Sequence, residues 1–146
     1  MKKYLTLTIA MMMVLAVATI TADAQVFGSK QMSARIPFAF NVGNKTLPAG
    51  EYTVKVLNPN SDRYVLQVRS ADGKLSALIQ TNGAKANNPN NAKLVFHRYG
   101  DTYFFSQAQM AGDSTSLAAV KTSAERNKAH EIARNGSKAT VEIIAE

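Results

Sequence analysis

Apolar and polar residues alternate along much of the chain, and this alternation predicts short β-strands. Every second residue of 36–42 is apolar, which places four apolar side chains on one face of a strand. Pro37 cannot donate a ladder hydrogen bond, so it should lie near the start of this strand, or the strand should lie at a sheet edge. Residues 52–57 alternate in the same way and predict another strand.

The Asp72-Gly73 dipeptide separates two runs of strand-forming residues and predicts a hairpin with a type I′ turn. In such a turn both central residues have positive φ. The register set by this turn opposes apolar residues on one face: Val68 with Ala77, and Leu66 with Ile79. Residues 82–91, which are rich in Asn, Gly and Ala, are expected to form an exposed loop after the hairpin.

The densest aromatic stretch, residues 94–105, predicts a second hairpin, with Gly100-Asp101 as a two-residue turn that suits type II′. The implied pairs are Tyr99 with Thr102, Arg98 with Tyr103, His97 with Phe104 and Phe96 with Phe105. Phe96 and Phe105 then share one face, while Val95, His97 and Phe104 share the other. Both faces carry apolar bulk, so one should meet the core and the other should lie under a helix or form a binding surface.

The C-terminal region predicts one helix followed by a last strand. Thr122 and Glu125 fit a capping box, which predicts a helix over residues 123–134 that Asn135-Gly136 ends. The apolar side of this helix is thin, so it should dock, with the second face of the aromatic hairpin as the candidate position. Residues 138–145 predict the last strand. With about seven strands, the expected fold is mainly β: a small antiparallel β-sandwich or partly closed barrel, with one C-terminal helix before the last strand.

The N-terminus has the features of a secretory signal. Lys2 and Lys3 precede an apolar run over residues 5–20, and Ala22-Asp23-Ala24 matches a small-x-small cleavage site. We therefore expect a signal peptide over residues 1–24 and a single exported domain over 25–146, periplasmic or extracellular, with no membrane span after cleavage. The alternative is an uncleaved anchor, since the run approaches the length of the shortest spanning helices.

Charge and cysteine content narrow the classes of partner and chemistry. The chain has 17 Lys and Arg against 10 Asp and Glu, a net charge of +7, and loss of residues 1–24 removes Lys2, Lys3 and Asp23 and leaves +6. Basic charge outside the cytoplasm favours anionic surfaces such as acidic polysaccharide or lipid head groups. The favoured interpretation of this charge is nevertheless solubility from scattered lysines, because no run of like charges occurs. The absence of cysteine excludes thiol catalysis, thiolate metal sites and disulfides.

Residues 40–52 read F-N-V-G-N-K-T-L-P-A-G-E-Y. This segment resembles an F-x-V-G…L-P-A-G-x-Y pattern found in small secreted bacterial β-rich proteins of unassigned function, and the aromatic hairpin looks like part of the same group. Together the two stretches cover roughly residues 34–109. The resemblance implies a secreted β protein and carries no particular chemistry.

The usual catalytic signatures are absent. His130-Glu131 begins like a zinc-binding H-E-x-x-H helix, but Arg134 stands where the second histidine is needed. No G-x-S-x-G motif occurs, so no nucleophile elbow is indicated. The glycines stand singly in turns and form no phosphate loop. We therefore expect no metal and no cofactor, and an enzyme is not favoured.

The candidate binding residues lie in the aromatic hairpin: His97, Arg98, Tyr99 and Phe104. A sheet face that combines aromatic and arginine side chains is typical of single-stranded nucleic-acid sites, but export argues against that partner, so no nucleic acid is expected. The alternative is that these aromatic side chains fill the core.

The sequence therefore favours a secreted or periplasmic, non-enzymatic β domain that binds a ligand, an anionic envelope component or a protein partner. The second hypothesis is an enzyme whose site is assembled from residues distant in sequence. A spatial cluster of His97 with an acidic residue in a cleft would favour the enzyme.

Overall fold

The computed structural model describes residues 30–61, 63–133 and 137–146. The signal peptide predicted over residues 1–24 and the helix stop predicted at Asn135-Gly136 lie outside these residues. The strands are β1 (Gln31–Ile36), β2 (Phe40–Val42), β3 (Lys45–Leu47), β4 (Gly50–Val56), β5 (Tyr64–Ser70), β6 (Ser76–Lys85), β7 (Lys93–Tyr99), β8 (Thr102–Gln109), β9 (Thr115–Ala119) and β10 (Lys138–Ile144). Within the described residues there is one helix, α2 (Ser123–Ala133).

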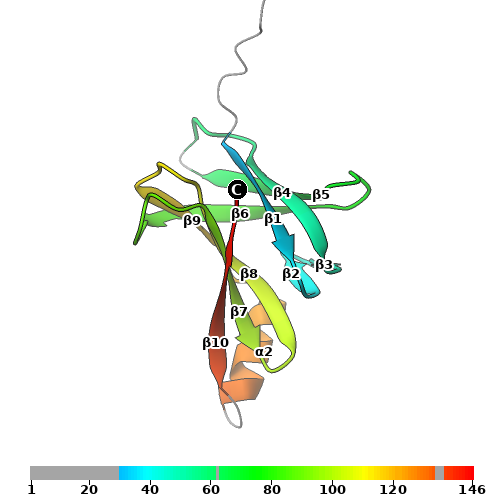
Figure 1. Cartoon of the computed structure of the whole chain (residues 1–146). Coiled ribbons are helices and arrows are strands. Elements are labelled where there is room, and N and C mark those ends of the chain that lie inside the picture. The colour runs from blue at the N-terminus through cyan, green and yellow to red at the C-terminus, as the bar shows by residue number, and fades with distance from the viewer. Residues whose placement is uncertain (1–29, 62, 134–136) are drawn as a thin grey trace, which may run out of the picture.

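All ten strands belong to one open sheet (Figure 1). One path through it has the order β1-β4-β5-β6-β9-β8-β2-β3, while β7 also pairs with β8, and β10 pairs with β7. Every pairing is antiparallel except that of β2 with β8. The mainly-β prediction is confirmed, but the strand count of about seven is wrong, and the sheet does not close into a complete barrel.

The strand predicted over residues 36–42 is in fact two strands. β1 ends at Ile36, and β2 begins at Phe40 and pairs with different neighbours. Pro37 removes a ladder donor at the break, which is the physical reason that one strand does not continue. β1 begins earlier than expected, because Met32, Ala34 and Ile36 are its buried residues.

The two ends of the described chain meet at one point. Ser33 of β1 and the C-terminal Glu146 exchange two backbone hydrogen bonds, of 2.8 and 2.9 Å. The amide of Ala145 also donates to the carbonyl of Ala92, 3.0 Å away, just before β7. The residues that follow β10 therefore connect β1 with the β7 region by backbone bonds.

Both predicted hairpins form in the predicted registers. Val68 lies opposite Ala77 and Leu66 opposite Ile79, as expected from the turn position. The turn type was wrong, because Gly73 has φ +74° while no described residue other than glycine has positive φ. The Gly73 amide instead donates to the carbonyl of Ser70, 2.8 Å away, which closes a β-turn over residues 70–73 in place of one centred on Asp72-Gly73.

The aromatic hairpin matches its prediction near the turn. Tyr99 pairs with Thr102, Arg98 with Tyr103, His97 with Phe104 and Phe96 with Phe105. A type II′ turn requires positive φ at its first central residue only. Gly100 has φ +62° and Asp101 does not have positive φ, which agrees with the predicted turn. Farther from the turn the register shifts between Val95 and Phe96, an irregularity that the sequence did not predict.

The loop predicted over residues 82–91 is shorter than expected. β6 continues to Lys85 because Thr81–Lys85 pair with Thr115–Ala119 of β9. Residues 115–119 on the other side of this pairing form β9.

The core is built from the inward residues of both hairpins and of β1, β2 and β4. The rings of Phe40, Phe96 and Phe105 are almost fully buried, and edge-to-face contacts join Phe40 to Phe96 at 5.3 Å and Phe96 to Phe105 at 5.9 Å between ring centroids. Most of the remaining core side chains are aliphatic, such as Val54, Leu66 and Leu94, and Tyr52 adds another buried ring.

The helix packs beside the outer face of the aromatic hairpin, as predicted. α2 lies against β7 and β10 at one end of the molecule (Figure 1). Ile132 reaches Gly100, where its Cδ1 is 3.4 Å from the place that a Cβ would occupy. The most buried residue of the helix is the acidic Glu125, with 4% exposure, whereas Ala133 is exposed. The docking contact is therefore largely polar.

Candidate functional site

Three side chains from three elements meet between the aromatic hairpin and the helix. The Oγ atom of Ser106 on β8 lies 3.0 Å from Nε2 of His97 on β7. The Nδ1 atom of the same imidazole lies 2.8 Å from Oε1 of Glu125 on α2. We call Ser106, His97 and Glu125 the relay, because the imidazole connects a hydroxyl to a carboxylate.

Ser106 lies at a β-bulge. It is the one residue of β8 with no partner in the β7, β2 or β9 registers, and it lies opposite the register shift in β7. Phe105 and Ala108 on either side of it remain in the core. Ser106 lies two residues after Phe104, so alternation already places it on the face of His97, and the extra residue restores Ala108 to the core.

The start of α2 positions Glu125. The Glu125 amide donates to Oγ1 of Thr122, 3.1 Å away, which confirms Thr122 as the N-cap. In a capping box the glutamate side chain would reach back to the N-cap amide. Here the carboxylate instead accepts hydrogen bonds from His97 and from the hydroxyl of Tyr99, 3.3 Å away.

The buried carboxylate sets the protonation of its neighbours. Burial, the charge of Glu125 and the hydrogen bond to it raise the pKa of the Tyr99 hydroxyl above its ordinary value of 10.0, so Tyr99 remains a donor. A carboxylate can only accept, so Nδ1 of His97 carries the hydrogen that points at Glu125. In the neutral imidazole, Nε2 is then free to accept the hydroxyl hydrogen of Ser106.

The structure brings three of the four sequence-predicted site residues together. His97, Tyr99 and Phe104 share the outer face of the hairpin, and the rings of Tyr99 and Phe104 lie 5.9 Å apart, centroid to centroid. Both rings are buried, with 2% and 5% exposure, so they do not form an open aromatic platform. Arg98 does not join them: its Nε donates to the carbonyl of Gly100, and its guanidinium lies over the ring of Tyr103.

Sequence reasoning missed Ser106 and Glu125 as site residues. Glu125 gave a signal, but the signal was for helix capping rather than for contact with His97. Ser106 gave none, because a bulge is recognisable only once the partners of β8 are known.

A second feature is a groove on the outward face of β1, β4 and β5. It has a volume of about 430 Å³ and is lined by Gln31, Thr53, Lys55, Gln67, Arg69 and the turn over residues 70–73. Register pairs place Gln31, Lys55 and Gln67 in one row and Thr53 and Arg69 in the next. Lys55 and Arg69 form no ion pair with any residue of the described part of the chain. We call these five side chains the polar groove.

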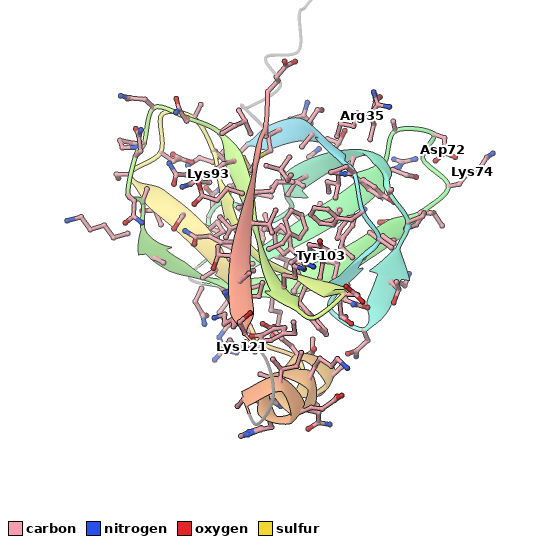
Figure 2. All side chains as sticks on the ribbon, turned by 60° about the horizontal axis from the view of Figure 1, so that its bottom comes forward. Arg35, Asp72, Lys74, Lys93, Tyr103 and Lys121 are labelled. Carbon is pink, nitrogen blue, oxygen red and sulfur yellow. The ribbon has the colours of Figure 1, made fainter. Side chains whose placement is uncertain are left out.

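One carboxylate lies at the rim of the polar groove. A hydrogen bond from Ser70 and one from the Lys74 amide lower the pKa of Asp72, so it is negatively charged at neutral pH. These local partners, together with the Lys74 side chain 3.8 Å away, engage Asp72 within its own turn (Figure 2). Neither cation of the groove forms an ion pair with this carboxylate.

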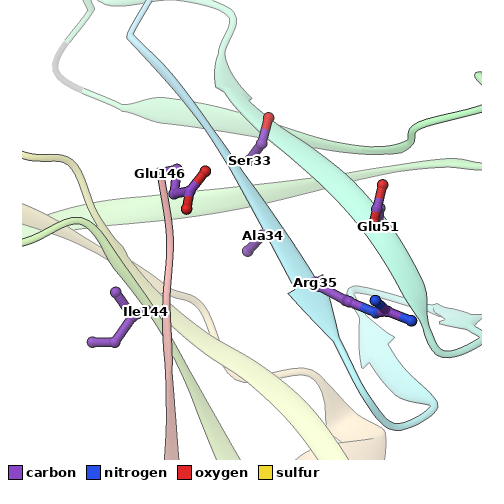
Figure 3. Close-up of a pocket in the computed structure, with 6 residues that line it drawn as sticks. All are labelled: Ser33, Ala34, Arg35, Glu51, Ile144 and Glu146. Atoms are coloured by element: carbon purple, nitrogen blue, oxygen red, sulfur yellow. The ribbon is translucent and has the colours of Figure 1, made fainter.

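A neighbouring cavity of about 380 Å³ lies where β1 meets the C-terminus (Figure 3). It is lined by Ser33, Ala34, Arg35, Glu51, Ile144 and Glu146. Its charged side chains are one arginine and two glutamates, so it does not share the basic character of the polar groove.

Neither metal ligands nor a membrane-spanning helix are found in the part of the chain that the structure describes. Over residues 30–61, 63–133 and 137–146, no three side chains of His, Cys, Asp or Glu converge. The same residues contain no helix with the length and apolar character needed to cross a bilayer. Comparisons with protein-family models, curated proteins and solved structures gave no match.

Proposed function

We propose that this protein is an exported β domain that binds an anionic polymer of the cell envelope through the polar groove. The observation that carries the proposal is the pair of cations, Lys55 and Arg69, which have no carboxylate partner among the described residues and stand beside neutral hydrogen-bonding side chains. Arginine and lysine beside amide and hydroxyl groups suit the carboxylates and hydroxyls of an acidic polysaccharide.

The wider charge distribution supports this proposal. The net charge, +7 for the full sequence and +6 after loss of residues 1–24, favours the approach of a polyanion, and the polar groove supplies specific contacts at short range. The signal-like N-terminus and the resemblance of residues 40–52 to secreted bacterial proteins both support export to the periplasm or beyond.

For the scaffold, we propose a partly closed barrel rather than a sandwich. All ten strands lie in one sheet, and the Ser33–Glu146 backbone bonds bring its two ends together at one point. A sandwich would need two separate sheets packed face to face.

The test is binding of polygalacturonate, with neutral dextran as the reference polymer. The double variant Lys55→Ala/Arg69→Ala should bind polygalacturonate at least about tenfold more weakly, because each charge-assisted hydrogen bond is worth about 1.5–3 kcal/mol and 1.4 kcal/mol is tenfold in affinity. The matched control is Lys85→Ala/Lys121→Ala, which removes the same charge from exposed positions outside the groove. Figure 2 shows Lys121 near the helix, away from Asp72 and Lys74 at the turn beside the groove.

Two results would contradict the proposal. One is equal weakening by the two double variants, which would mean that net charge alone drives the binding. The other is the same affinity for dextran and polygalacturonate at low salt, where attraction between exposed charges is least screened.

A further inference from the structure

We propose that the relay is a catalytic site in which Ser106 accepts an acyl group from a short-chain ester and His97 acts as its general base. This inference goes beyond binding in the polar groove and rests on different residues. It gives a concrete form to the hypothesis of an enzyme whose site is assembled from residues distant in sequence. Ser106 and Glu125 lie 9 and 28 positions from His97 in the sequence, and the three side chains meet only in the fold.

The order and distances of the relay are those that activate a serine. A serine hydroxyl is a weak nucleophile until a base within hydrogen-bond reach takes its proton. Nε2 of His97 lies 3.0 Å from Oγ of Ser106, which is inside that reach. The base is in turn held by a third group, Glu125, at 2.8 Å. A nucleophile, a base and an orienting acid in this order define the triad geometry independently of fold or motif.

The carboxylate of the relay is buried, whereas its base and its nucleophile are partly exposed, as catalysis on a substrate from solvent requires. The Glu125 side chain is 5% exposed, so its attraction for a charged imidazole is little screened by water. The His97 side chain is 17% exposed and Ser106 is half-buried, so both can be reached from solvent. Ser116 provides a contrast, because it is fully buried and engaged by Gln107 and the Ala84 carbonyl.

The bulge is a second, independent observation. Ser106 is the residue that β8 leaves without a strand partner, and it is turned toward the imidazole. Bulges are enriched next to active sites, where they re-aim one side chain.

The reaction balances without any further reagent except water. Ser106 Oγ attacks the ester carbonyl carbon while Nε2 of His97 takes the hydroxyl proton, and a C–Oγ bond forms. The bond from that carbon to the leaving alcohol then breaks as His97 returns the proton to the alcohol oxygen. Water attacks the acyl-serine and gives its proton to His97, the C–Oγ bond breaks, and Ser106 recovers its hydrogen. The sum is ester plus water giving acid plus alcohol.

The surroundings of the relay limit the substrate class. Neither the polar groove nor the cavity beside β1 is lined by relay residues. The helix covers Glu125, and the buried rings of Tyr99 and Phe104 fill the adjoining face. The site therefore suits a small acyl group, such as acetyl, presented from solvent.

Covalent labelling tests the proposal directly. The full chain is incubated with a small fluorophosphonate, which modifies activated serines, and the product is followed by intact mass and peptide mapping. We expect one adduct at Ser106 and slow hydrolysis of p-nitrophenyl acetate that depends on the same residue. Ser106→Ala should abolish both, and His97→Gln should lower the labelling rate about 100-fold or more, since a general base supplies about 10²–10⁴-fold.

Two further variants separate catalysis from folding. Ser76→Ala removes a half-buried serine with no histidine contact and should leave labelling unchanged. Glu125→Gln keeps an oxygen acceptor but loses the charge that orients the imidazole, so it should slow labelling of Ser106 while circular dichroism stays that of the parent protein. Glu125 is thus a positioning residue.

The proposal is overturned if the unmodified protein gives no Ser106 adduct, and this result does not depend on whether any variant folds. It is also overturned if folded His97→Gln protein labels at the parent rate. In either case the relay would serve only to fasten α2 to the sheet, and binding in the polar groove would be unaffected.

Discussion

Replacing Glu125 by alanine should undock α2, because this carboxylate is the main buried contact that the helix makes. Glu125 is 4% exposed and accepts hydrogen bonds from His97 and from Tyr99. The apolar residues of the helix contribute little, since Ala124 and Ala133 are exposed and Ile132 is half-buried. A helix of 11 residues is marginal in water without tertiary contacts.

The expected loss of stability follows from two hydrogen-bond donors, the Tyr99 hydroxyl and Nδ1 of His97, which lose their acceptor in Glu125→Ala. A buried polar group that loses its partner costs about 1–3 kcal/mol. The Tyr99 hydroxyl belongs to a residue of 2% exposure and should contribute near the upper value, whereas water can partly replace the partner of His97. The sum of about 2–4 kcal/mol corresponds to a fall of roughly 8–16 °C in melting temperature for a domain of this size.

The assay is thermal unfolding followed by circular dichroism, together with binding of a hydrophobic dye at 25 °C. Glu131→Ala is the control, because Glu131 lies on the same helix but is exposed and pairs only with Lys128 at the surface. Such a pair contributes about 0–1 kcal/mol. If Glu125→Ala and Glu131→Ala melt within about 2 °C of each other and neither binds dye, then Glu125 does not hold the helix.

A deletion would test this contact less well than a substitution. Removing all residues after Lys121 also removes β10, which pairs with β7 along its whole length. Loss of stability would then follow from the lost strand whether or not the helix covers the hairpin.

Three other outcomes are expected. Gly73→Val should lower the melting temperature by several degrees relative to Ala71→Val in the same turn. A residue with a side chain at φ +74° is destabilised by about 1–2 kcal/mol, and the new Cβ would lie 2.7 Å from Nη2 of Arg69. Equal melting temperatures for the two variants would contradict this turn geometry. The raised pKa of Tyr99 means that its contribution to stability is complete below pH 10 and is lost as the pH rises through the folded-state pKa, so urea midpoints measured from pH 9 upward should fall less steeply in Tyr99→Phe. Mass spectrometry of exported protein should show a chain that starts at Gln25, and an intact Met1 terminus in the membrane fraction would contradict cleavage.

Local patterns predicted the hairpins well because turn position and side-chain alternation fix a register together. Gly100-Asp101 fixed the pairing of Phe96 with Phe105, and both rings entered the core as expected. The turn around Gly73 shows the limit of this reasoning: several loop geometries share one register, so the pairs were right while the turn type was wrong.

Contacts between distant elements could not be read from the same patterns. The capping-box pattern identified Thr122 and Glu125 correctly as the start of a helix, but it assigned the carboxylate to the backbone. Its actual partner, His97, comes from another element, and nothing in either local sequence encodes that proximity. β2 and β3 have three residues each, which is too short for alternation to identify them or to count strands reliably.

The polar groove could be predicted from the sequence only in part. Alternation with the buried Val54 and Val68 already requires Lys55 and Arg69 to point outward. What alternation leaves out is which strands are neighbours, and the order β1-β4-β5 supplies this by placing Lys55 between Gln31 and Gln67. A shift of one residue in the pairing register of β4 and β5 would move the outward side chains of one strand to the core face. Because the buried pair Val54–Val68 opposes that slip, the packing that stabilises the sheet also fixes the arrangement of the groove.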